Sequence, residues 1–485
     1  MQSSFNVYYA VSALVFLASL LGVGYALSRR HQITSTHDFA VASRQMGAPR
    51  MVLMNIATYL SAVSLIGFTG YGYTSGFALL SFFFGTVLGH LPLSLVAKRL
   101  HAWHVSSMPE FMGERYHSTM LRGWFGLVFI AIYTVYLMLN LVGVGVLLHS
   151  VAGLPIWLSE LVVLIALMGY VAFGGMRVTS LVNSVQAVII LIVVLGGAAI
   201  AIGVAGGLGS FINEVHSVKP ILLSATSGGA LTPSILLGTT LGWMSGVACR
   251  ADFAAQALSG SRARVAGWTL GLPAIVIVVV YLGLNIIGLS VRTRLPALTS
   301  ADAAFPLFFR DVAPGWTGWI MIFALLSGIT AACDSYILTI SSIVSNDIVK
   351  PIMARRRADM AHTERIAVYA ARATVLVSAA IAFVVSLTNI PLLALATLSL
   401  FVVWGSACFV PIYGGLLWRR GSLMAAFVSS LVGIALAALW LIAPPFASGA
   451  SALVGLLGSL VVYVGISLWP RRATLTTSTA QSVDV

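Results

Sequence analysis

Residues 55–72 read NIATYLSAVSLIGFTGYG, and this segment carries the strongest indication of the architecture. It lies inside an apolar run long enough to cross a bilayer, yet it holds several hydroxyl groups and the glycines Gly67, Gly70 and Gly72. Small residues allow close helix packing, which is the simplest interpretation of any single glycine. Interrupted membrane helices, however, expose backbone carbonyls that coordinate ions near the bilayer midplane. The segment therefore predicts a broken membrane helix.

A second apolar run, near residues 233–249, has a similar composition. It brings glycines and hydroxyl residues together around one tryptophan, at Gly238, Thr239, Thr240, Gly242, Trp243, Ser245 and Gly246. These two runs are the second and the seventh in the chain, so they lie five apart. Two matched breaks at this interval predict a five-plus-five inverted repeat, with runs 2 to 6 matching runs 7 to 11.

The composition excludes a soluble protein. Of 485 residues, 59% are hydrophobic and only 8% are charged, with a mean hydropathy of +1.00, whereas soluble domains carry about 25% charged residues. The net charge of +13 is spread over short basic runs between apolar segments, which argues against a nucleic-acid partner. Cys249, Cys333 and Cys408 lack the spacing that zinc ligands need. The chain is predicted to be an all-α polytopic protein of the plasma (inner) membrane, with the lipid bilayer as its surroundings.

A bilayer crossing needs about 20 apolar residues. Thirteen runs approach this length, near 6–28, 51–75, 77–97, 123–149, 154–173, 178–205, 233–249, 265–290, 316–345, 373–388, 391–417, 421–443 and 447–469. We therefore predict one transmembrane domain over residues 1–472, with repeats at about 51–205 and 233–417. Residues 473–485 form a short polar tail.

The distribution of Lys and Arg predicts the orientation. With thirteen crossings, 22 of the 26 basic residues fall on the side where the first run ends, and only Lys219, Arg292, Arg294 and Arg310 fall opposite. Basic loops stay in the cytoplasm. The amino terminus is therefore expected outside and the carboxyl terminus in the cytoplasm.

Asp334 is the only acidic residue deep in an apolar run. A charge at the centre of a membrane helix costs about 2.5 to 3.5 kcal/mol on insertion scales, so a carboxylate there indicates a functional site. A structural carboxyl hydrogen-bonded to Thr330 is the simpler alternative. Asp252 and Asp347 lie beside basic residues at the ends of runs and are expected to be paired or solvated. Every Lys and Arg is expected in or near a loop, which leaves no intramembrane cation for an anionic solute.

The chain resembles the solute:sodium symporter family over nearly its whole length. The resemblance rests on four segments in order: residues 38–44 (DFAVASR), Ala57 to Gly72, Phe173 to Arg177 (FGGMR) leading into Asn183 and Gln186, and residues 341–350 (SSIVSNDIVK). It implies the LeuT-like inverted-repeat fold and secondary active symport of a small organic solute. It implies no cofactor.

The resemblance also implies two cation sites. In the family's main sodium site, carbonyls match Ala57 and Leu60, and a further carbonyl and two hydroxyls match Gly328, Ala331 and Ala332. The two hydroxyls are absent here, so this site is expected to be weak unless water or Thr330 replaces them.

At the second site, the family's usual aspartate is replaced by Asn183, and a position that normally carries a hydroxyl is Asp334, followed by Ser335. The carboxylate has changed helices. We therefore expect Asp334, Ser335 and Asn183 to hold the coupling ion, which is Na+ by family. A proton is the alternative, because a carboxyl in apolar surroundings can take up and release one. No metal other than Na+ is expected.

The family's general layout implies that Ser64, Phe68, Trp243 and Trp404 face the solute, which is a monocarboxylate, a sugar or an amino acid. A solute sensor acting through a separate partner is the alternative from another functional class. A membrane enzyme is disfavoured, because almost all of the 13 acidic residues fall in loops. The sequence does not define the oligomeric state.

Overall fold

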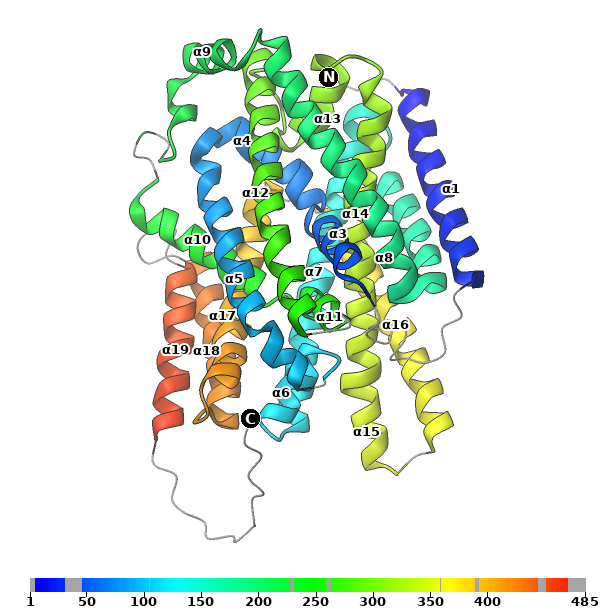
Figure 1. The fold of residues 1–485 in the computed structure, drawn as a ribbon, viewed down its shortest axis with the longest axis vertical. Helices are drawn as coiled ribbons and strands as arrows, with labels where there is room; N and C mark the ends of the chain where they lie inside the picture. The colour runs from blue at the N-terminus through cyan, green and yellow to red at the C-terminus, as the bar shows by residue number, and fades with distance from the viewer. Residues whose placement is uncertain are drawn as a thin grey trace.

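The computed structural model describes residues 5–30, 46–103, 105–226, 228, 231–259, 263–357, 359–388, 392–443 and 451–469, nearly all of them helical (Figure 1). The segment 38–44 and the tail 473–485 lie outside these ranges. The helices of the first half are α1 (Val7–Arg30), α3 (Ala48–Tyr59), η2 (Val63–Gly67), α4 (Phe68–Ser75), η3 (Gly76–Leu79), α5 (Leu80–Ala102), α6 (Met108–Arg115), α7 (Thr119–Ala152), α8 (Ile156–Val204), α9 (Leu208–Val218) and η4 (Pro220–Leu223).

The second half begins with α10 at Pro233. Its helices are α10 (Pro233–Ala248), α11 (Ala251–Leu258), α12 (Ala263–Arg294), η6 (Ala301–Ala303), α13 (Ala304–Leu307), η7 (Phe308–Val312), α14 (Thr317–Ser342), η8 (Ile343–Val349), α15 (Lys350–Arg355), α16 (Met360–Ser386), α17 (Leu393–Leu417), α18 (Leu423–Ile442) and α19 (Ser451–Leu468). In Figure 1, α1 lies at one edge of the bundle and α18 and α19 at the other, with α3, α7, α11 and α14 between them.

Ten helices among the described residues are long and apolar enough to cross a membrane. This confirms a helical multi-pass protein. Two features of the predicted runs lower this count below thirteen. Helix α10 has only 16 residues, and the predicted run 51–75 is interrupted, so that its second part continues into the run 77–97.

Helix α8 has 49 residues, a length of about 74 Å if straight. Its two halves instead run antiparallel. Ile156, at one end, contacts Gly145 of α7, and Gly197, near the other end, contacts Phe309, whose neighbour Arg310 donates to the carbonyl of Ser150 in α7. Met176, near the middle, clusters with Met46, Met51 and Met54 around the start of α3. Both ends of α8 therefore lie at the same side of the protein.

The predicted interruption of the second run is present. Helix α3 ends at Tyr59, the backbone of Leu60 leaves helical geometry (φ −81°, ψ 62°), and the chain resumes as the π-helical turn η2 and then α4. The amide N–H of Ala62 has lost its helical acceptor and donates to Oδ1 of Asn140 in α7, at 3.1 Å. A buried unpaired N–H is costly, so this side chain stabilises the break.

The predicted break of the seventh run was misplaced. Residues 238–246 form continuous helix within α10, and the break follows at Cys249 and Arg250, before α11 begins. The glycines serve helix packing instead: a Cβ on Gly246 would lie 2.3 Å from the Phe401 ring, and one on Gly242 would lie 2.7 Å from Val402. The glycines of this run therefore allow α10 to pack closely against α17, and they do not mark unwound backbone.

Helix α9, α13 and one end of α12 lie at the same end of the molecule (Figure 1), and charged residues of these segments and of η7, which follows α13, form a polar layer there. Arg294 pairs with Glu214 of α9, at 3.2 Å, and Arg310 pairs with Asp311, at 2.7 Å. The helix α9 itself, which buries Phe211 and Val215, was not predicted. At the opposite end, α16 begins at Met360, thirteen residues before the predicted run. Three of the four basic residues assigned to the less basic side, Arg292, Arg294 and Arg310, thus lie at the α9 end.

Asp302, in η6, connects this layer to the start of α17 and to α4. Its Oδ2 accepts a hydrogen bond from the N–H of Leu393, at the start of α17, at 3.0 Å, and its Oδ1 lies against Gly70 of α4 without a hydrogen-bond partner among the described residues. Burial raises the pKa of Asp302 to about 7, while the Leu393 N–H acts in the opposite direction. Burial therefore shifts Asp302 toward its neutral form relative to the unfolded chain.

This pKa predicts a pH-dependent stability. Between the unfolded value of 3.8 and about 7, the folded protein keeps a proton that the unfolded chain has lost. Stability then falls as pH rises, by at most about 1.4 kcal/mol per pH unit. Asp302→Asn keeps an acceptor for Leu393 and should remove this contribution: its melting temperature should match the wild type at pH 4 and exceed it at pH 8. Asp311→Asn, a partly exposed acid of the same layer, is the matched control. Identical pH profiles for Asp302→Asn and the wild type would contradict the assignment.

Candidate functional site

The three residues predicted to hold the coupling ion lie together. Asp334 of α14 is 1% exposed. Its Oδ1 accepts hydrogen bonds from Nδ2 of Asn183 in α8 and from the hydroxyl of Ser335, both at 3.3 Å. These hydrogen-bond partners are uncharged, so within the described residues the carboxylate is solvated by neutral dipoles. The geometry brings the predicted set into contact, and its role as a cation site stays a prediction.

Ser335 connects Asp334 to the broken second run. Its hydroxyl lies 3.1 Å from Oγ1 of Thr58 in α3 and 3.1 Å from the carbonyl of Ala331. We call Asp334, Ser335, Asn183 and Thr58, with the Ala331 carbonyl, the cation cluster. Gln256 of α11 extends it, donating to Thr58 at 3.2 Å. The cluster therefore joins α3, α8 and α14, and α11 reaches it through Gln256.

Several oxygens of this region have no hydrogen-bond partner among the described residues. They are Oδ2 of Asp334, Oδ1 of Asn183 and Oε1 of Gln186, all buried. The amide nitrogen of Gln186 donates to Thr330 at 3.0 Å, whereas its amide oxygen accepts no hydrogen bond from the described residues. Buried polar groups are normally paired. An excess of acceptors around one carboxylate is the electrostatic environment that a hard cation requires.

The residues matching the family's main sodium site have a different arrangement. Leu60 and Gly328 are in direct contact, since a Cβ on Gly328 would lie 2.2 Å from the Leu60 carbonyl oxygen. The Ala331 carbonyl accepts from Asn183 at 3.4 Å, and the Ser335 hydroxyl, which has one proton for Asp334 or for this carbonyl, lies 3.1 Å away. Ala57, Ala331 and Ala332 are fully buried and contribute methyl groups. These contacts place the break beside α14, and the two alanines supply no side-chain oxygen there.

The four predicted solute-facing residues all border Tyr59 or its aromatic neighbours. The Ser64 hydroxyl donates to the Tyr59 carbonyl at 2.8 Å, and Nε1 of Trp243 donates to the Tyr59 hydroxyl at 2.9 Å. Phe68 packs edge-on against Trp243, with ring centroids 5.2 Å apart. Trp404 is reached through Phe401, which contacts both tryptophans. All four side chains are buried.

Every Lys and Arg was expected in or near a loop, with no cation inside the membrane domain, but Arg250 is buried inside the protein. This residue forms the break between α10 and α11 and is 0% exposed. Its guanidinium makes a bidentate pair with Asp252, at 3.0 and 2.5 Å, and Asp252 also accepts from the Tyr133 hydroxyl at 2.7 Å. A charged residue that ends an apolar run normally marks the membrane surface, but this run ends inside the protein.

Four aromatic rings surround the Arg250 guanidinium. Its Cζ lies 3.7 Å from the ring centre of Phe253, 5.5 Å from Tyr136, 5.6 Å from Tyr59 and 5.8 Å from Tyr336. We call these rings the aromatic box. Cations over aromatic faces are stabilised, more so when desolvated. The box and the Asp252 pair together explain how a guanidinium is tolerated here.

His90 lies next to the same box. Its ring is 5.2 Å from that of Tyr59 and 5.6 Å from that of Phe253, and its Nδ1 lies 2.9 Å from the Thr86 carbonyl. A carbonyl only accepts, so Nδ1 carries the proton. The contacts of His90 are those of a packing residue.

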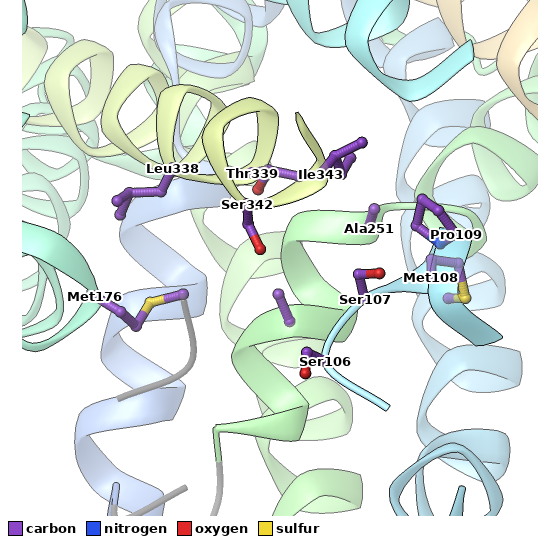
Figure 2. A pocket seen from close by; sticks show the side chains of 11 residues that line it. Ser106, Ser107, Met108, Pro109, Met176, Ala251, Leu338, Thr339, Ser342 and Ile343 are labelled. Atoms are coloured by element: carbon purple, nitrogen blue, oxygen red, sulfur yellow. The ribbon is translucent and has the colours of Figure 1, made fainter. Parts of the chain in front are cut away.

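Figure 2 shows a pocket that begins one helical turn beyond the cation cluster on α14. It lies between α14, α11 and the segment before α6, with Met176 on its far side. Leu338 and Thr339, one turn beyond Asp334 and Ser335, form one wall, and Ser107 forms another. Ser107 donates to Asp347, which also accepts from Arg122 at 2.9 Å. This confirms that Asp347 is paired, and it shows that the pair fixes the pocket wall.

Similarity to known proteins shows the family of this chain. The model of the "Sodium:solute symporter family" matches residues 39–433. The chain belongs to the sodium:solute symporter family. The sodium/pantothenate symporter of Escherichia coli is 24% identical over 438 residues, covering 87% of this chain and 88% of that protein. An osmoregulated proline transporter of Bacillus subtilis is 24% identical over 445 residues, covering 88% and 87%.

Solved structures show the same fold. A Na+-coupled sialic acid symporter in a substrate-bound outward-open state superposes with a TM-score of 0.77, at 16% identity, over 96% of this chain and 98% of that one. Mhp1, of the nucleobase-cation-symport-1 family, gives a TM-score of 0.59, at 13% identity, over 90% and 95%. The fold is therefore LeuT-like, and family membership makes this protein a cation-coupled symporter of the plasma membrane.

Proposed function

We propose that this symporter couples the entry of Na+, bound at the cation cluster, to the uptake of a small organic solute bound beside Tyr59. The observation that carries the proposal is the buried carboxylate of Asp334, which has neutral hydrogen-bond partners and a free oxygen among the described residues. A cation there offsets the cost of burying the charge. The protein acts as a transporter and not as an enzyme.

The two sites share three structural elements. Thr58 faces the cation cluster and Tyr59 borders the solute residues, and these are adjacent residues of α3. On α14, Ser335 likewise contacts Thr58 in the cation cluster, and the adjacent Tyr336 belongs to the aromatic box. On α11, Gln256 contacts Thr58 while Phe253 packs on Arg250. A cation that orders these helices changes the solute site as well, which is the physical basis of coupling.

The pocket supplies a route for the cation. Thr339 lines it and donates to the Ser335 carbonyl at 2.7 Å, so it reaches to within one helical turn of the cluster. In the proposed orientation, with thirteen crossings and the amino terminus outside, this pocket opens toward the cytoplasm. Both breaks, at Leu60 and at Cys249, fall in the first predicted run of a proposed inverted repeat, at about 51–205 and 233–417.

Proton coupling is the second candidate, and one observation favours it. The two hydroxyls of the family's main sodium site are replaced by Ala331 and Ala332, so the ligand set of that main site is incomplete. Asp334 alone can still bind and release a proton.

Melting of the purified protein against sodium concentration, at several pH values and at constant ionic strength, distinguishes the two ions. A ligand at 100 times its dissociation constant adds about 2.7 kcal/mol of stability. A saturable sodium-specific rise that Asp334→Asn abolishes supports sodium. A pH-dependent stability removed by the same variant, without a sodium effect, supports the proton.

Glu160→Gln is the matched control. Glu160 is another fully buried carboxylate, bonded to the Ser386 hydroxyl at 2.5 Å and remote from the cluster in its contacts. It should keep the wild-type sodium response. If neither ion affects stability through Asp334, the proposed site is wrong.

A further inference from the structure

Arg250 has one nitrogen more than its ion pair uses. Nε and Nη2 donate to Asp252, whereas Nη1 is buried without a hydrogen-bond partner among the described residues. A guanidinium always carries its charge and its donors. An unsatisfied buried donor of a charged group is expensive, and the fold maintains it at the centre of the aromatic box.

The aromatic box itself carries one further polar group without a partner. The hydroxyl of Tyr336, whose ring belongs to the box, also lacks a hydrogen-bond partner among the described residues. The box is linked to the predicted solute residues, because Tyr59 belongs to it and accepts from Trp243. Small-molecule sites combine such apolar walls with a few convergent polar groups.

We propose that the free Nη1 edge of Arg250 binds the carboxylate of the transported solute, so that the substrate class is small organic carboxylates. This proposal rests on the proposed function. Arginine binds carboxylates through charge-assisted hydrogen bonds, and the aromatic box provides the apolar contact surface for the remainder of the solute.

The charges around the site fit this ligand. Arg250 and Asp252 together are neutral, so a bound carboxylate adds one negative charge. The cation cluster lies on the neighbouring residues of α3 and α14, and a cation bound there compensates that charge. Binding of the anion therefore strengthens binding of the coupling cation, and the reverse also holds. This mutual effect couples transport of a carboxylate to transport of the cation.

The test measures binding to the full-length protein in sodium, by thermal shift over a concentration series. The probes are acetate, pyruvate, lactate, proline and pantothenate, each compared with its amide. We expect at least one carboxylate to bind at least tenfold more tightly than its amide. The variant Arg250→Gln with Asp252→Asn keeps the pair neutral and similar in size, and it should reduce this preference to less than twofold. Arg294→Gln with Glu214→Gln, a charge pair in the α9 layer, is the matched control and should keep it.

Two results would overturn the proposal: wild-type protein that prefers no carboxylate over its amide, or a preference that survives in the Arg250/Asp252 double variant. If that double variant does not fold, Arg250→Lys replaces it. Lysine keeps a charge beside Asp252 but lacks the planar fork, so an unchanged preference would also refute the role of Nη1. Sodium stabilisation without carboxylate preference leaves cation coupling intact and rejects this inference. Carboxylate preference in the wild type, together with no effect of sodium or pH on melting through Asp334, rejects the cation coupling instead.

Discussion

Asp334→Asn is expected to abolish accumulation of solute against its gradient while leaving solute exchange across the membrane intact. The carboxylate is the only charged member of the cation cluster, and its amide analogue keeps the hydrogen-bonding shape but not the charge. Without a bound cation, the transport cycle has no driving force, although the solute site beside Tyr59 is unchanged. The predicted change is a fall from concentrative uptake to equilibration.

Proteoliposomes that contain the purified variant provide the measurement. Uptake of a labelled solute is followed under an inward sodium gradient, and exchange is followed with unlabelled solute inside and no gradient. Glu160→Gln, which removes a different buried carboxylate, should accumulate solute like the wild type. Full accumulation by Asp334→Asn would show that the coupling ion binds elsewhere.

Asp252→Asn is expected to destabilise the protein by about 3 to 5 kcal/mol, because it leaves the buried Arg250 guanidinium without its counter-charge. The pair is almost completely buried, at 0% and 2% exposure. Adding Arg250→Gln should recover most of the loss, since a neutral amide pair has no charge to bury. The double variant should thus be more stable than the single one, the reverse of additive behaviour.

Urea or thermal unfolding of the wild type, both single variants and the double variant completes this cycle. Arg294→Gln, in a partly exposed pair with Glu214, is the control for loss of an ion pair at the surface. Its cost should stay below about 1 kcal/mol. Equal and additive effects of the two buried substitutions would mean that the aromatic box, and not Asp252, stabilises the guanidinium.

Much of the cation cluster was predictable because its signals are local. Asp334 stands out as a carboxylate in an apolar run, and the family resemblance singled out Asn183 and Ser335. Thr58 and Gln256 were missed, although Thr58 lies in the segment that indicated the break. A threonine in a membrane helix usually bonds to its own backbone. Only the packing of α3 against α14 and α11 turns it toward Ser335.

The sequence by itself determined that the protein crosses the membrane as helices, that its second run is interrupted, and that a carboxylate lies at depth, because these follow from hydrophobicity and from local composition. The tertiary structure alone decided where the seventh run breaks and what Arg250 does. The sequence around an arginine at the end of an apolar run does not distinguish a run that ends at the membrane surface from one that ends inside the protein. The partners that make burial of Arg250 tolerable come from three separate helices, α3, α7 and α14, and from Asp252 and Phe253 beside it on α11.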